Sequence, residues 1–131
     1  MSEAAGIVVT NNDAAAAWVR RECGQALTLV YADETLMATM TKARDLVHKG
    51  HRLLTSPLAG NFRPDQMPYK SVLLSADAGD VDAGSLMIIE HWFAKYNQCM
   101  KNAAPPQWDE KTRENCKMID LSLVERALRT V

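Results

Sequence analysis

The chain has 131 residues and a formal net charge of −1 at pH 7. Hydrophobic residues make up 47% and charged residues 24%, which is enough apolar surface for one folded core. We therefore expect a single domain over residues 1–131. The balanced charge provides no long-range attraction for nucleic acid or for an anionic membrane, so the composition argues against both as partners.

The sequence shows the pattern of neither a membrane span nor a secretory leader. Its longest apolar stretches are Ile7–Thr10, Ala26–Tyr31 and Leu86–Ile89. All three are far shorter than the ~20 residues that a membrane-spanning helix needs. The first five residues contain an acid and lack the basic region of a secretory signal. These features predict a cytoplasmic protein.

The three cysteines are odd in number and widely spaced, without the Cys-x-x-Cys pairs of zinc or thiol-exchange sites. We expect reduced thiols, because disulfides are rare in the cytoplasm. Cys23 and Cys99 lie within helical patterns, where buried packing explains a cysteine better than a reactive thiol does.

The first half of the chain alternates strands and helices. Ile7–Thr10 is a β-branched strand, and it ends at Asn11 and Asn12, which favour the start of a helix. The alanine-rich sequence that follows predicts a helix from Asp13 to about Arg21.

A second strand, Ala26–Tyr31, is apolar nearly throughout, as is typical of a parallel strand covered on both faces. Asp33 is placed to cap a second helix, which ends at Gly50 in a left-handed conformation. The apolar residues of this helix recur at steps of three and four and predict one buried stripe. The stripe comprises Leu36, Met40, Ala43 and Val47.

The second half begins with a third predicted strand, His51–Thr55, an irregular segment over residues 56–69, and a fourth strand, Ser71–Ser75. Apolar residues at steps of three and four predict a helix over Leu86–Met100. A last helical segment starts at Asp109.

This alternation predicts an α/β fold with a small, mostly parallel sheet of about four strands and helices on both faces, a Rossmann-like three-layer arrangement. We expect the C-terminal helices to pack on the sheet. Only a loop separates the third and fourth predicted strands, so these two can also pair antiparallel and give the sheet a mixed edge.

Ligands of such folds bind beyond the carboxyl ends of the strands, where loops and helix N-termini meet. If the first and third strands run side by side in the same direction, the residues that follow them share one mouth. The candidate ligand-binding residues at this rim are Thr10, Asn11, Asn12, Thr55, Ser56, Gly60 and Arg63.

Two features of this rim have alternative explanations. The paired asparagines could offer amide groups to a carboxylate or phosphate, although capping alone is the simpler explanation. Gly60 permits close backbone approach, and Arg63 can bind an oxyanion through two parallel hydrogen bonds. An ordered surface loop with a solvated or ion-paired Arg63 explains the same sequence equally well.

The motifs with a defined mechanism are missing from the sequence: there is no Gly-rich phosphate loop, nucleophile elbow or zinc-protease helix motif. His48 and His51 flank the turn at the opposite end of the predicted sheet, and His91 has no acid or cysteine at metal-ligand spacing. We expect neither a metal nor a cofactor. Whether the protein is an enzyme is left open.

Four stretches together resemble the GrdX-like family. They are Val8–Asn12, Arg44–Thr55, Ser56–Pro64 and Pro68–Ser71, and the resemblance spans residues 7 to 90. The family is named for genes that lie with glycine, sarcosine and betaine reductase components, and its biochemical role is not established. The resemblance therefore implies an association with amino-acid reductase metabolism, and it implies no catalytic residue.

The chain departs from the family pattern at two places. The family has histidine where Ser56 stands and proline where Asp13 stands, so an acid or base role of that histidine would be absent here.

We expect a non-catalytic accessory protein of glycine and betaine reductase metabolism. It would bind a small anionic metabolite, or a partner such as a reductase component protein, at the rim. One alternative is a small transferase or lyase that uses Ser56 or Asp13. Another is a structural or assembly subunit that contacts a partner, or a second copy in a homo-oligomer, through Trp92, Phe93 and Tyr96. Packing in the core explains these rings better.

Overall fold

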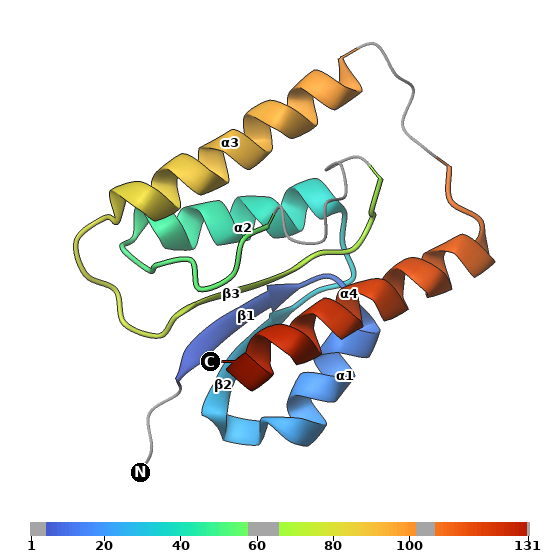
Figure 1. Ribbon diagram of the computed structural model, residues 1–131, viewed down its shortest axis with the longest axis horizontal. Coiled ribbons are helices and arrows are strands. Elements are labelled where there is room, and N and C mark those ends of the chain that lie inside the picture. The colour runs from blue at the N-terminus through green and yellow to red at the C-terminus, as the bar shows by residue number, and fades with distance from the viewer. Residues whose placement is uncertain (1–4, 58–65, 102–106, 131) are drawn as a thin grey trace.

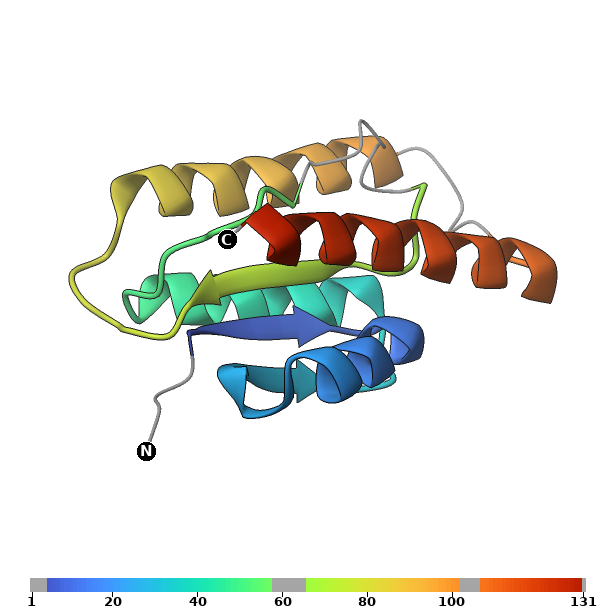
Figure 2. The ribbon, with the colours of Figure 1, turned by 60° about the horizontal axis from the view of Figure 1, so that its bottom comes forward.

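The computed structural model of the protein describes residues 5–57, 66–101 and 107–130. In this part of the chain a small β-sheet lies between two layers of helices, as Figure 1 and Figure 2 show. α2 and α3 cover one face of the sheet, and α1 and α4 cover the other. Each face has its own cluster of buried apolar side chains.

The sheet of the described residues is mixed and has the strand order β2-β1-β3. β1 (Gly6–Thr10) is central, and it pairs in parallel with β2 (Leu27–Tyr31) and antiparallel with β3 (Ser71–Ser75). The register of the antiparallel pair places Thr10, the last residue of β1, opposite Ser71. The end of β1 and the beginning of β3 therefore lie at the same end of the sheet.

The predicted fold class, a mostly parallel Rossmann-like sheet of about four strands, is wrong. The predicted third strand, His51–Thr55, forms only an isolated bridge, in which Leu53 pairs with Leu74 on the outer edge of β3. Its ladder is interrupted because the backbone N–H groups of Leu54 and Thr55 both donate to the carbonyl oxygen of Leu73. β3 itself occupies the second edge of β1, so residues 51–55 never meet the central strand.

The helices on the two sides of the sheet begin at side chains that cap their free N–H groups. Asn12 caps α1 (Asp13–Glu22) by accepting a hydrogen bond from the backbone of Ala14. Thr35, and not the predicted Asp33, caps α2 (Leu36–His48). A short 3₁₀ turn, Gly24–Ala26, leads from α1 into β2.

The remaining helices form the C-terminal third of the protein. α3 spans Ala83–Met100 and is capped by Asp82. α4 spans Glu110–Thr130, and Asp109 accepts a hydrogen bond from the backbone N–H of Thr112 at its start. In the described residues, no helix combines the length and the hydrophobicity that a membrane span requires.

The predicted stripe of α2 is confirmed, because all four of its residues are buried against the sheet. Trp92 and Phe93 of α3 complete this core, with Trp92 wholly inaccessible and stacked on Tyr96. Trp92 and Phe93 therefore offer no exposed surface for an assembly role, whereas Tyr96 is half-buried, and an assembly role stays a prediction. On the other face, Val8 and Leu73 of the sheet pack with Val19 of α1 and Val124 of α4.

Candidate functional site

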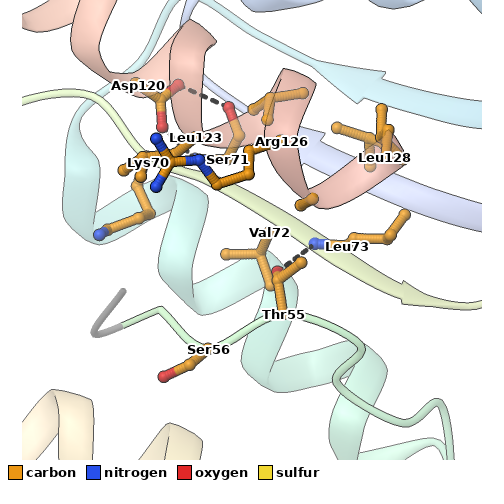
Figure 3. A pocket seen from close by; sticks show the side chains of 13 residues that line it. Thr55, Ser56, Lys70, Ser71, Val72, Leu73, Asp120, Leu123, Arg126 and Leu128 are labelled. Carbon is orange, nitrogen blue, oxygen red and sulfur yellow. Dashed lines mark hydrogen bonds between the residues drawn. The ribbon is translucent and has the colours of Figure 1, made fainter. Parts of the chain in front are cut away.

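A cavity of about 570 Å³ lies between β3 and α4, with residues 55 and 56 along one side. Figure 3 shows the side chains that line it. Its described polar residues come from the segment beside β3, from the start of β3 and from α4. They are Thr55, Ser56, Lys70, Ser71, Asp120 and Arg126.

Asp120 lies at the polar end of the cavity and is only 3% exposed. Its carboxylate accepts hydrogen bonds from the backbone N–H of Ser71 at 3.1 Å, from the Ser71 hydroxyl at 2.6 Å, and from Nδ2 of Asn12 at 3.0 Å. Burial raises the pKa of Asp120, while these hydrogen bonds and the charge of Lys70 act in the opposite direction. Three of the roughly four lone-pair positions of this carboxylate are thus occupied by the protein.

Lys70 lies directly before β3 and is partly buried. Its backbone N–H donates to Oδ1 of Asn11 at 3.0 Å, which fixes the main chain at this point. Burial lowers the pKa of the Lys70 ammonium, and the nearby Asp120 charge offsets part of this effect. Figure 3 shows the Lys70 side chain directed away from Asp120, and no described side chain forms an ion pair with it.

The structure places the predicted residues Thr10, Asn11 and Asn12 behind the polar end of the cavity, all of them buried. Oγ1 of Thr10 lies 2.7 Å from Oγ of Ser71. The side-chain amide of Asn11 donates to the carbonyl oxygens of two loops, at Glu34 and Pro68.

Asn12 is fully occupied by protein contacts. Besides capping α1, it donates to Asp120 and to the carbonyl oxygen of Lys117 on α4. The polar atoms of both asparagines therefore hold structural hydrogen bonds, although capping, the simpler explanation from the sequence, accounts for Asn12 alone. A ligand role for Thr10, Asn11 and Asn12 stays a prediction.

Two further predicted residues, Thr55 and Ser56, line the cavity itself. Oγ1 of Thr55 accepts a hydrogen bond from the backbone N–H of Leu73 at 3.0 Å, which holds this segment against β3. The remaining two, Gly60 and Arg63, lie outside the described residues. The chain after β1 and the chain after residue 55 lie at the same end of the sheet, as predicted. However, β3 lies between the two segments, so they do not follow neighbouring parallel strands.

A family model described as GrdX-like protein matches residues 7–129. The chain belongs to the GrdX-like family. The match covers nearly the whole chain and includes α4, which the resemblance in the sequence did not reach. No curated protein and no solved structure matches the chain.

Four polar residues of the cavity in this GrdX-like protein were not predicted from the sequence: Lys70, Ser71, Asp120 and Arg126. One signal could have revealed Asp120. Cys116, Asp120 and Val124 are spaced by four along α4, and all three are buried, so an acid stands within the apolar stripe of a helix. A buried acid at such a position needs polar partners from another element.

The other reactive side chains of the described residues provide weaker candidates for a functional site. Within the described ranges, no cluster of three or more His, Cys, Asp or Glu residues could hold a metal ion. The three cysteines are unpaired, and burial raises the pKa of Cys23 and Cys116, which disfavours the reactive thiolate. His51 contacts the carbonyl oxygen of Ser75, at the opposite end of β3 from the cavity's polar residues.

Proposed function

We propose that this protein is a non-catalytic accessory protein that binds a small anionic metabolite in the cavity between β3 and α4. Membership of the GrdX-like family supports an association with glycine reductase-related systems. A reductase component as its protein partner stays a prediction. The observation that carries the proposal is that Lys70 lines the cavity, is partly withdrawn from water and has no ion-pair partner among the described side chains.

A desolvated ammonium favours a bound anion. Removal from water penalises its positive charge, and an anion that enters the cavity restores the lost stabilisation through a charge-assisted hydrogen bond. The lowered pKa of Lys70 reports the same penalty, since burial is its largest cause. The binding free energy of an anion should therefore be more favourable beside Lys70 than beside an exposed lysine.

The state of Asp120 argues for an anion rather than an amino group. A carboxylate in a cavity would normally attract a ligand ammonium, but Asp120 already accepts three hydrogen bonds from Ser71 and Asn12. Its oxygens are turned to the protein interior, where they join α4 to the sheet. Of the two cations that line the cavity, Lys70 is partly buried and Arg126 is exposed, so an anion gains most from contact with Lys70.

The test is isothermal titration calorimetry of the full chain with acetate, hexanoate and inorganic phosphate. The variant Lys70→Met removes the charge and keeps a long side chain, and Lys95→Met, an exposed position on α3, is the matched control. Loss of a charge-assisted hydrogen bond should weaken binding of the anion that binds wild type best by at least about tenfold in Lys70→Met. Lys95→Met should bind as wild type does. Equal binding by Lys70→Met, or no binding of any anion to wild type, would overturn the proposal.

A further inference from the structure

We infer that the cavity selects an amphiphilic monocarboxylate, with its carboxylate at Lys70 and a hydrocarbon body lying between β3 and α4. The inference rests on the proposed function and names the ligand class for the same site. It depends on how polar and apolar side chains are distributed along the cavity.

The cavity is more polar toward Lys70 and Asp120 and more apolar toward Leu73 and Leu128, although Thr55 contacts Leu73 and Arg126 follows Val124 on α4. On β3 the lining runs from Lys70 and Ser71 to Leu73, and on α4 it runs from Asp120 to Leu128. Figure 3 shows Lys70 and Asp120 on one side and Leu73 and Leu128 on the other. A ligand with one charged end and one apolar end matches this distribution.

The apolar part is built by two strands and one helix face. The α4 residues are spaced by one and four, so they project from the same side of the helix toward the sheet. Together with the strand residues they form a continuous hydrocarbon surface. This surface comprises Val8, Leu73, Leu123, Val124, Ala127 and Leu128.

The volume of the cavity also indicates a ligand larger than acetate or phosphate. At about 570 Å³ the cavity lies within the range of pockets that enclose drug-sized ligands, roughly 300–1,000 Å³. Acetate or phosphate at Lys70 would leave the partly exposed part of the apolar surface, at Leu123, Ala127 and Leu128, in contact with water. A hydrocarbon body would instead bury it, and this burial is the main source of favourable free energy that the cavity offers.

The charges of the site favour a single negative charge on the ligand. Lys70 contributes one positive charge at the buried end, and Asp120 places a carboxylate close enough to influence its pKa. A dianion would leave one charge uncompensated beside Asp120. The Arg126 side chain is exposed, so water and salt screen its charge.

The inference is tested by calorimetric titration of the wild-type chain with straight-chain carboxylates from acetate to decanoate, at fixed pH and below the critical micelle concentration. Affinity should rise by about fourfold per added methylene until the cavity is filled, which corresponds to the free energy of burying one CH₂. The alcohol of equal chain length should bind at least about tenfold more weakly, because it lacks the charge-assisted hydrogen bond.

Two variants locate the hydrocarbon body. Leu123→Ser makes the apolar surface polar and should reduce the gain per methylene, while Leu46→Ser changes a partly buried leucine of α2 on the opposite face of the sheet and should leave it unchanged. Circular dichroism establishes that each variant is folded. If Leu123→Ser does not fold, the chain-length series on wild type decides by itself.

The outcomes separate the two proposals. If binding needs Lys70 but does not depend on chain length, the amphiphile is excluded and the anion site stands. If affinity rises with chain length equally for carboxylates and alcohols and Lys70→Met has no effect, the anion site is excluded, and this inference with it.

Discussion

The Asp120 carboxylate accepts a hydrogen bond of 2.6 Å from the Ser71 hydroxyl and thereby joins α4 to the first residue of β3. The same hydroxyl lies 2.7 Å from Oγ1 of Thr10 at the end of β1. Asn12 adds a second connection, from the N-cap of α1 to Asp120. One buried network therefore holds four elements, β1, α1, β3 and α4, together directly behind the polar end of the cavity.

We predict that Asp120→Ala lowers the free energy of unfolding by about 1–3 kcal/mol. The substitution removes the acceptor of the backbone N–H of Ser71, in a hydrogen bond that is part-buried. Chemical denaturation followed by circular dichroism measures the change. Glu125→Ala, a partly exposed position on the same helix, should lie within about 0.5 kcal/mol of wild type, and an equal effect of the two substitutions would contradict the role of Asp120.

The raised pKa of Asp120 predicts a specific dependence of stability on pH. Because the folded protein holds the Asp120 proton more tightly than the unfolded chain does, the contribution of this group to stability is fully present below the ordinary aspartate pKa. It is lost as the pH rises through the raised pKa. Asp120→Asn cannot ionise, so the stability of wild type relative to this variant should fall between acidic pH and neutrality. Denaturation curves over that range test the sign, and a difference that rises or stays constant would refute the raised pKa.

The helices and the three strands could be located from the sequence because each depends on local patterns. The stripe of α2 shows a clear helical period, and the asparagines after β1 have the side chains that cap a helix. The direction of β3 has no such signal. The segment over residues 56–69 is long enough for either orientation, and antiparallel pairing with β1 is decided by contacts between distant residues.

The candidate site was only partly predictable for the same reason. Thr55 and Ser56 were found because they follow an apolar run, and they do line the cavity. Lys70 and Asp120 are separated by 50 positions, and only the packing of α4 against β3 brings them to one cavity. The sequence also could not show that the polar atoms of Asn12 contact Lys117 and Asp120 of α4, because these partners lie more than 100 positions away.

Gly50 should tolerate no side chain. Its φ of 106° is a conformation that favours glycine, and a Cβ at this position would overlap the carbonyl oxygen of Gly79, whose N–H donates to the carbonyl of Gly50. We predict that Gly50→Ala lowers the free energy of unfolding by roughly 2–4 kcal/mol, from backbone strain and overlap together.

Gly24 provides the matched control, because it also has a positive φ, of 53°, but nothing lies near its missing side chain. Gly24→Ala should cost about 1 kcal/mol, the strain alone. Thermal or urea unfolding of the two variants gives the comparison, and equal losses would show that the close approach of Gly79 is unimportant.

At neutral pH the free energy of unfolding of Lys70→Met should be at least as large as that of wild type. Most substitutions of partly buried residues lower it instead. Burial is the largest influence on the Lys70 pKa and lowers it, which means that the folded state disfavours the charged form more than the unfolded chain does. This penalty operates at neutral pH. It is relieved for wild type as the pH rises from the lowered pKa toward the ordinary lysine value, because the folded protein then loses its proton first. The stability advantage of Lys70→Met should accordingly shrink in alkaline solution. Urea denaturation from neutral to alkaline pH measures the difference in stability. If Lys70→Met is less stable than wild type at neutral pH, the ammonium stabilises the fold, and its charge is not left uncompensated for a ligand.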